Sequence, residues 1–276
     1  MRKETRAKRR FIIWSMVVII LLTAALIGPN FITHDIYEVD LYNVTAAPSR
    51  EYPFGTDYLG RCILCRLIAG AARSIYSAFA VVIITFIVGT VIGTLCGYIG
   101  GTFDMIVMRI TDAVQAFPSM VFTIAIAAMM GSGLGNCILA MSAVGWAGYC
   151  RIARSRVMSV KEAPYVDAAR ISGMGKAKIL FSTVLPNSLT SLVVYASMHV
   201  GNAILSFSGL SYLGLGTAPP FPEWGSMLNS GRATLQQAPW TVIYPGLAIM
   251  LIVIVMGIYG DSINKYMDSK NNAKGL

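Results

Sequence analysis

The feature that most constrains this chain is a series of five long stretches without Asp, Glu, Lys or Arg. Each stretch is longer than the about 20 residues that an α-helix needs to cross a hydrocarbon core of roughly 30 Å. Such a pattern predicts a protein that crosses a membrane several times. The stretches are Phe11–Thr33, Ser74–Phe103, Ala113–Cys150, Ile179–Pro222 and Ala233–Gly260.

Turn-forming residues divide these stretches into six predicted transmembrane helices. The third stretch is interrupted by Gly131-Ser132-Gly133 and indicates two helices. The second half of the fourth holds several helix breakers, among them Pro219 and Pro220, which are too many for a lipid-exposed span. We therefore predict an all-α polytopic membrane protein with spans at about 11–29, 76–98, 104–130, 136–157, 187–208 and 241–261.

Composition and charge placement agree with this prediction. Only 13% of the residues are charged, against about 25% in ordinary soluble domains. The net charge of +9 could suggest nucleic acid, but most of the 22 Lys and Arg residues flank the spans on one predicted side. By the positive-inside rule both termini are cytoplasmic, and a seventh helix would put the lysine-containing tail outside. The basic residues left outside are Arg50, Arg61, Arg66, Arg73 and Arg232.

The first span has two interpretations. A basic N-terminus before an apolar stretch also fits a cleaved signal peptide. Five further spans follow, and no small-residue cleavage pattern precedes Gly28-Pro29, so an uncleaved anchor helix is favoured. Three regions are predicted: a tail, first helix and external loop at 1–75, a transmembrane domain at 76–265, and a cytoplasmic tail at 266–276. The external part from His34 to Arg73 is expected to be an ordered loop or small cap.

The cytoplasmic segment 159–186 carries the most information. Its apolar residues follow an interrupted helical periodicity, with Gly173 and Gly175 in the middle. We predict two short helices joined by a glycine bend and ended by Pro186, which begins the next span. A helix lying on the lipid headgroups and a helix docking on another protein both fit this pattern.

The same segment holds no phosphate-binding loop. Gly175-Lys176 is superficially similar to one, but Arg170 stands where the first glycine is required, and no strand precedes it. The chain is therefore predicted not to bind and hydrolyse ATP itself.

At this segment the sequence resembles the binding-protein-dependent ABC importer permeases. Their cytoplasmic signature is Glu-Ala-Ala, three residues, Gly, nine residues and Ile-x-Leu-Pro. Asp167 replaces the usual Glu and keeps the carboxylate, whereas Thr183 replaces the usual Ile. The matching, ATPase-coupling positions are Asp167, Ala168, Ala169, Gly173, Leu185 and Pro186.

Three other motifs are similar to those of the second permease subunit of the peptide/nickel importers. They lie after the first span, at the entry of the third helix and in the final external loop, which is their order in that subfamily. The external positions are Gly55, Thr56, Asp57, Gly60, Arg61, Gly214, Gly216 and Trp224, and the helix-entry positions are Arg109, Asp112 and Pro118.

The resemblance implies a MetI-like permease fold in a bacterial-type inner membrane. The chain would form half of a pore beside a second, homologous permease. Two ATPase subunits would carry ATP and Mg, and an external solute-binding protein would deliver the substrate. ATP binding would close the ATPase dimer and switch the pore from inward-facing to outward-facing. The chain itself is expected to be no enzyme and to bind no cofactor, metal or nucleic acid.

The substrate class is expected to be nickel or peptide. Val144–Tyr149, together with the Ile204–Gly216 stretch that contains Gly209, is slightly more similar to the nickel-type members. Dipeptide or oligopeptide import is the alternative.

Polar residues inside the spans have competing interpretations. Arg109 and Asp112, three residues apart, are expected to form a structural ion pair, and Pro118 to kink the third helix. His199 is expected to be a packed, neutral histidine, with a transient metal ligand as the alternative. The remote enzymatic hypotheses are a Ser132/His199 protease and a redox membrane enzyme that uses Cys62 and Cys65.

The cysteines are expected to be mainly structural. Cys62 and Cys65 form an external C-x-x-C, where the family usually has Asp and Ser. Such a pair can be a redox couple or half of a metal site, but no second pair exists, so substitution by small residues is favoured. The others are expected to be small apolar fillers of the spans, namely Cys96, Cys137 and Cys150.

Overall fold

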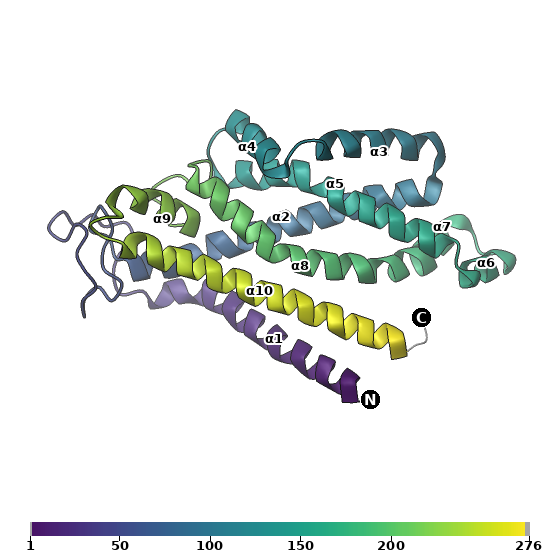
Figure 1. The fold of residues 1–276 in the computed structure, drawn as a ribbon, viewed down its shortest axis with the longest axis horizontal. Helices are drawn as coiled ribbons and strands as arrows, with labels where there is room; N and C mark the ends of the chain where they lie inside the picture. The colour runs from purple at the N-terminus through teal and green to yellow at the C-terminus, as the bar shows by residue number, and fades with distance from the viewer. Residues whose placement is uncertain (1, 274–276) are drawn as a thin grey trace.

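The structure, a computed structural model, describes the backbone of residues 2–273 and the side chains of residues 5–270. Apart from one isolated bridge between Thr56 and Cys62, these residues contain no strand pairing. The helices run in an elongated bundle (Figure 1). They are α1 (Arg2–Ile27), η1 (Gly28–Phe31), α2 (Ile63–Ile99), α3 (Gly101–Gln115), α4 (Ser119–Met130), α5 (Leu134–Lys161), α6 (Pro164–Ile171), α7 (Lys176–Ile179), the π-helical η2 (Leu180–Val184), α8 (Leu185–Tyr212), α9 (Trp224–Gly231), η3 (Arg232–Thr234) and α10 (Trp240–Ala273).

Each predicted span corresponds to a helix or a helix pair, in the predicted order. Four helical segments of the described chain are long and apolar enough to cross a membrane, and the bent pair α3–α4 would make a fifth. Helix α5, at the place of the fourth predicted span, is less apolar because it contains Asn136 and several arginines. The four segments are Thr5–Phe31, Ile63–Ile99, Lys176–Tyr212 and Trp240–Lys270.

The third predicted span is not one kinked helix. Helix α3 ends at Gln115, α4 begins at Ser119, and the two axes differ by 89°. Pro118 has no N–H to donate and its ring disfavours helical geometry at Phe117, so the helix stops there. The proline that was expected to kink the span therefore divides it into two nearly perpendicular helices.

Segment 34–73, which was predicted to be external, also differs from the prediction at its end. Helix α2 already begins at Ile63, where the Cys62 side chain accepts a hydrogen bond from the Cys65 N–H. The preceding residues form an ordered loop without helix or extended strand. Backbone hydrogen bonds within this loop join Asp40 to Leu59 and Ala46 to Thr56, each at 3.0 Å.

Helices α2 and α5 form the most extensive contact of the bundle, and three glycines allow it. A Cβ on Gly93 would lie 2.2 Å from the Cys150 carbonyl oxygen, and one on Gly89 would lie 2.5 Å from that of Trp146. Gly97 approaches Arg154 in the same way. Glycines spaced four residues apart lie on one face of a helix, so this stripe brings the two backbones together as small residues do in membrane helix pairs.

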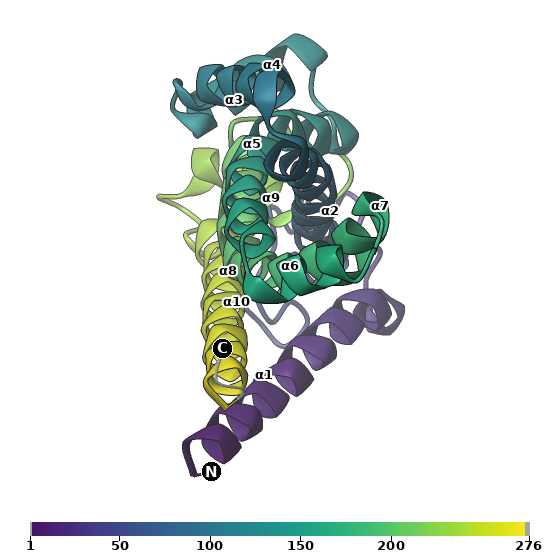
Figure 2. The same cartoon turned by 90° about the vertical axis from the view of Figure 1, so that its right-hand side faces the viewer.

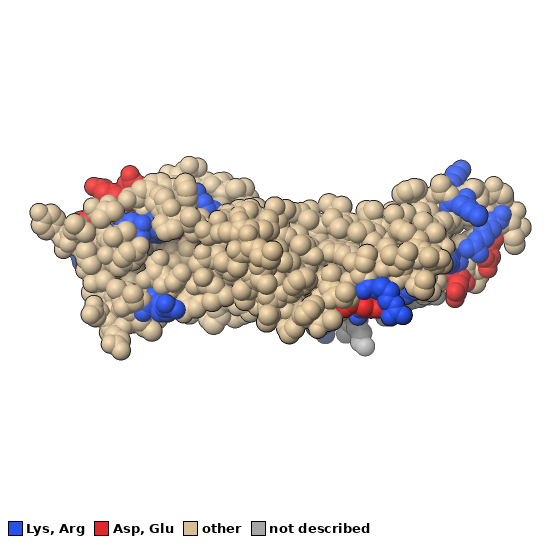
Figure 3. Space-filling model, turned by 90° about the horizontal axis from the view of Figure 1, so that it is seen from above, with Lys and Arg blue, Asp and Glu red and all other residues tan. Residues whose placement is uncertain are grey.

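The two ends of the bundle are formed by different segments of the chain. The beginning of α1, the end of α10 and helices α6 and α7 lie towards one end, whereas α9 and the loop before α2 lie at the other (Figure 1). In the end-on view, α3 and α4 lie on the side of the bundle opposite to α1 (Figure 2). The face drawn in Figure 3 has its Lys, Arg, Asp and Glu residues towards the ends and a wide uncharged belt between them. This arrangement is the one expected of a membrane-spanning bundle.

Candidate functional site

Segment 159–186, which was predicted to be cytoplasmic, forms two short helices around a glycine turn, as predicted. Helix α6 ends in a turn in which the Met174 N–H donates to the Ala169 carbonyl and the Gly173 N–H donates to that of Arg170. This pair of bonds is a Schellman motif, which requires a left-handed residue after the helix. Gly173 supplies it, with φ of +77°.

One face of this segment is packed and the other is open. Val166, Ile179 and Val184 are buried against the end of α5. Ala168 lies on the exposed side, and the Ile171 side chain three residues later is 88% exposed. Small and apolar residues on the outside of a short helix form a surface suited to contact with another protein.

The carboxylate of the signature motif lies on this open side. Asp167 accepts a hydrogen bond from Arg170 at 2.8 Å, and both side chains are about half exposed. Because it is exposed, this carboxylate is accessible to a partner. Separating it from Arg170 would cost little, since exposed ion pairs contribute little stability. Gly173 is also exposed, and a Cβ there would meet no atom within 4 Å.

Pro186 lies in the first turn of α8, as predicted, but helical structure does not begin there. Helical structure continues from α7 through the π-helical turn η2 into α8, so one apolar segment runs from Lys176 to Tyr212. A π-turn widens the helix locally and accommodates a proline that cannot donate to the preceding turn. Leu185 and Pro186 are the first residues of α8, and the glycine turn is therefore joined to a membrane helix without a loop.

A cavity of about 580 Å³ lies between α2, α5, α8 and the α3–α4 bend. Four of its polar lining residues follow each other along one face of α8: Tyr195, His199, Asn202 and Ser206. The His199 ring lies 4.0 Å from the Tyr195 ring, centroid to centroid, and 6.1 Å from the Tyr149 ring. His199 is thus an aromatic-packed wall residue, as expected, but it borders an open space.

These cavity residues were missed in the sequence, apart from His199. Their spacing of four, three and four residues is the period of one helix face, and this polar face within an apolar span was the available signal. Phe117 and Met120 from the α3–α4 bend close another side of the cavity.

The first external motif forms a compact corner at the start of α2. Asp57 lies 2.8 Å from Nη2 of Arg61 and 3.6 Å from Nε of Arg66, with both arginines buried. Gly55 and Gly60 both have positive φ, and a Cβ on Gly60 would overlap the Asp40 carbonyl. The corner is completed by Thr56, which is fully buried and whose hydroxyl accepts from the Ala46 N–H at 2.7 Å.

The second external motif packs α9 onto α2 and α8. Glu223 is fully buried and accepts hydrogen bonds from Ser74 Oγ and from the N–H groups of Gly225 and Ser226, at 2.9–3.0 Å. Burial raises the pKa of the Glu223 carboxyl, while the two N–H groups favour its charged form and oppose the rise. The Trp224 indole donates to the Leu67 carbonyl at 2.8 Å.

Two glycines make the turn that leads from α8 to this motif. Gly214 has φ of +84°, a conformation that glycine adopts without strain. A Cβ on Gly216 would lie 2.0 Å from Ser211 Oγ, so only glycine fits against the end of α8.

The predicted ion pair between Arg109 and Asp112 is wrong. Asp112 binds Arg151 of α5 instead, at 2.8 Å from its Nη2. Helix α3 packs along α5 through ion pairs, so its carboxylates face the arginines of that neighbour, whereas Arg109 is exposed. The residues proposed for a protease are both used otherwise, since Ser132 lies in the α4–α5 turn and His199 in the cavity wall.

The three other cysteines lie inside helices, as expected of apolar fillers. Cys96, Cys137 and Cys150 are fully buried, and all five cysteines of the chain are free thiols. Among the residues whose side chains are described, only the pair Cys62 and Cys65 lies close to a third side chain that can bind a metal.

A family model described as "Binding-protein-dependent transport system inner membrane component" matches residues 89–272. This range contains segment 159–186 and the α8 wall of the cavity. The chain belongs to this family. It is a family of transport permeases and not of enzymes, and its membership makes the bundle a multi-pass inner membrane permease of the ABC importer type.

Similar permeases match nearly the whole chain. The dipeptide transport system permease protein DppC of Alkalihalophilus pseudofirmus is 37% identical over 268 residues, which cover 97% of this chain and 88% of that protein. The glutathione transport system permease protein GsiD of Pectobacterium atrosepticum is 38% identical over 231 residues, covering 84% and 77%. The probable D,D-dipeptide transport system permease protein DdpC of Escherichia coli K12 is 34% identical over 284 residues, covering 99% and 95%.

Proposed function

We propose that this permease forms half of the translocation pore of an ATP-driven importer of short peptides. The three relatives described above are named for dipeptide, D,D-dipeptide and glutathione transport. They favour the peptide alternative and give no support to the slight preference for nickel. The cavity of about 580 Å³ lies within the roughly 300–1,000 Å³ typical of small-molecule sites.

The observation that carries the proposal is the continuity between an exposed docking helix and the cavity wall. Helix α6 presents Ala168 and Ile171 outward, and the Gly173 turn joins it to the unbroken segment 176–212. The same segment presents Tyr195 and His199 to the cavity. A movement of α6 against a partner would therefore be transmitted to the cavity wall along one helix.

In the proposed assembly the chain pairs with a second permease and with two ATPase subunits that bind ATP and Mg. Both termini and α6 face the cytoplasm, and a solute-binding protein delivers peptide at the α9 end. The carboxylate of Asp167 and the small side chains of Ala168 and Ala169 form the ATPase contact. The chain's part in the cycle is mechanical and requires no cofactor of its own.

Two neighbouring glycines allow a matched test of the docking role. In Gly173→Val a β-branched residue must adopt φ of +77°, which is a strained conformation, so α6 should be displaced and the ATPase should no longer co-purify. Gly175→Ala is the control, because Gly175 has φ of −64° and open space around its Cβ position. Normal transport by Gly173→Val would contradict the docking role.

The substrate is tested by uptake into vesicles that contain the complete importer. We expect a labelled dipeptide to accumulate with ATP and unlabelled peptides to compete with it. Uptake of Ni²⁺ that dipeptides do not reduce would contradict the peptide assignment.

The α3–α4 bend has its own test: unchanged transport by Pro118→Ala would exclude a role of this break in gating.

A further inference from the structure

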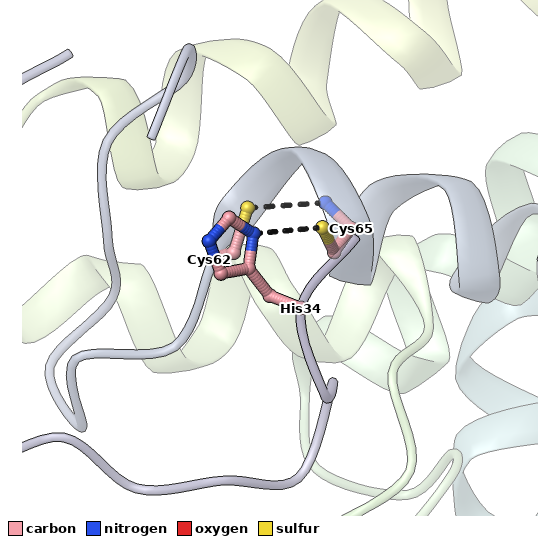
Figure 4. Close-up of side chains that lie close together, drawn as sticks. All are labelled: His34, Cys62 and Cys65. Carbon is pink, nitrogen blue, oxygen red and sulfur yellow. Dashed lines mark hydrogen bonds between the residues drawn. The ribbon is translucent and has the colours of Figure 1, made fainter. Parts of the chain in front are cut away.

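Three side chains that can bind a metal converge at the external end of the bundle. Cys62 and Cys65 lie at the beginning of α2, and His34 comes from the loop that follows α1 (Figure 4). Their ligand atoms all lie within 4.8 Å of one another. The His34 Nδ1 is 3.9 Å from the Cys65 Sγ. The C-x-x-C pair, for which the sequence favoured a simple substitution by small residues, thus has a third potential ligand from 31 residues earlier in the chain.

The spacing fits a tetrahedral cation. Bonds of about 2.3 Å to sulfur and about 2.0 Å to nitrogen place two ligand atoms about 3.5–3.8 Å apart at the tetrahedral angle. The observed 3.9 Å between Nδ1 and Sγ requires only a small side-chain adjustment. The backbone already holds the two cysteines in one helical turn, in which the Cys65 N–H donates to the Cys62 Sγ at 3.5 Å.

The surroundings keep the three ligands in place and leave one side open. Cys62 and Cys65 are 2% and 3% exposed, whereas His34 is only partly buried and leaves an entry path. Tyr52 stacks on the imidazole at 4.9 Å between ring centroids and holds its plane. The Thr33 hydroxyl lies 3.1 Å from Nδ1, and a metal would replace this weak contact.

We propose that His34, Cys62 and Cys65 bind one borderline-soft divalent cation of the Zn²⁺ class, with water as the fourth ligand. On binding, the two thiols each lose a proton and two sulfur–metal bonds and one nitrogen–metal bond form. The cation fastens the loop after α1 to the first turn of α2. This site goes beyond the expectation that the chain holds no metal, and it is independent of the transported substrate.

The ligand set distinguishes this proposal from a plain disulfide. A disulfide between Cys62 and Cys65 would use both sulfurs and leave His34 without a role. Thiolate and imidazole together are the ligands preferred by Zn²⁺. A site with three protein ligands and one water ligand needs no second C-x-x-C, and the sequence has none.

The test uses Co²⁺ as a spectroscopic probe for the full chain in lipid nanodiscs. The protein carries a purification tag free of histidine and cysteine, and its reductant is removed under nitrogen before titration. We expect one Co²⁺ per chain, a thiolate-to-cobalt charge-transfer band and displacement of Co²⁺ by Zn²⁺. Cys62→Ser and Cys65→Ser should each weaken the charge-transfer band, and His34→Ala should weaken binding more than about 100-fold, beyond the typical effect of an outer-shell change.

Matched controls exist because the chain has two histidines and five cysteines. His199→Gln and Cys137→Ser change the other histidine and a buried cysteine outside the cluster, and both should bind Co²⁺ like the parent. His34→Cys supplies a third sulfur and should keep binding even if His34→Ala is poorly folded.

Two results would overturn the proposal. The first is Co²⁺ binding that is absent or unchanged in the Cys65→Ser variant. The second is a native Cys62–Cys65 disulfide, seen as a mass lower by two hydrogens and as two unreactive thiols in protein isolated without reductant.

Discussion

Arg154 of α5 holds Asp104 of α3 in a two-point contact, in which Nε and Nη2 each donate to a different carboxylate oxygen. The two side chains are 29% and 14% exposed. Thr111 is the one residue of α3 that is buried. This pair and the pair between Asp112 and Arg151 therefore join α3 to α5.

Removing this pair should loosen α3. Asp104→Asn leaves the partly buried Arg154 without its carboxylate, and we expect a loss of about 1–3 kcal/mol, typical of a hydrogen bond to a charged group. Asp112→Asn is the matched control, because its pair with Arg151 is about half exposed on both sides and should contribute less than about 1 kcal/mol. Thermal unfolding in detergent measures both variants. Equal effects would contradict the difference.

The glycine stripe of α2 gives a steric prediction. Gly93→Ala places a Cβ 2.2 Å from the Cys150 carbonyl, so the helices must separate, and we expect a loss of roughly 1–3 kcal/mol. At Gly257 of α10 the same change meets no atom within 4 Å and should stabilise by up to about 1 kcal/mol through helix propensity. The thermal midpoints of the two variants should therefore move in opposite directions.

Glu223 should make stability depend on pH. Its folded pKa is raised above the ordinary value of 4.5 by burial, so the folded protein holds this proton more tightly than the unfolded chain does. This contribution is fully present below pH 4.5 and is lost as pH rises through the folded pKa. Unfolding midpoints of the parent should show this fall, and Glu223→Gln, which cannot titrate, should lack it. An identical pH profile for the two proteins would contradict the assignment to Glu223.

The cavity wall gives a prediction for transport. Asn202 is exposed and faces the cavity, so Asn202→Trp should fill the space without disturbing the core. We expect peptide uptake to fall by roughly tenfold or more, since each 1.4 kcal/mol of added barrier slows a step tenfold. Ile83→Trp is the control, because Ile83 of α2 is 53% exposed and does not line the cavity. Uptake by both variants at the parent's rate would exclude this cavity from the path.

The positions of the membrane helices could be predicted because apolar length alone determines which segments can cross a bilayer. The ends could not, because helical hydrogen bonding continues past the membrane boundary where no breaker stops it. Helix α2 thus starts at Ile63 and α10 continues to Ala273, beyond the predicted limits on both sides. At Phe117-Pro118 the sequence indicates a disturbance, but the 89° angle depends on what α3 and α4 pack against.

The local structure of segment 159–186 was predictable because its signature is local. The glycine turn depends on φ at Gly173 and on bonds within a few residues, all of which follow from the chain nearby. Contacts between distant segments were not visible in this way. The partner of Asp112 is Arg151, and the neighbour of Cys65 is His34, and both pairings depend on the packed bundle.

The glycine contacts between α2 and α5 have a consequence for motion. Contacts between side chains can be rearranged by a change of rotamer, but a contact between two backbones has no alternative packing. Helices α2 and α5 should therefore move together as one rigid body that extends from the α9 end of the bundle to the α6 end. Any widening or narrowing of the cavity has to be taken up elsewhere. The bend between α3 and α4 borders the cavity, and α3 is joined to α5 by ion pairs, which can separate and form again. We therefore expect α3 to be the part of the cavity wall that moves.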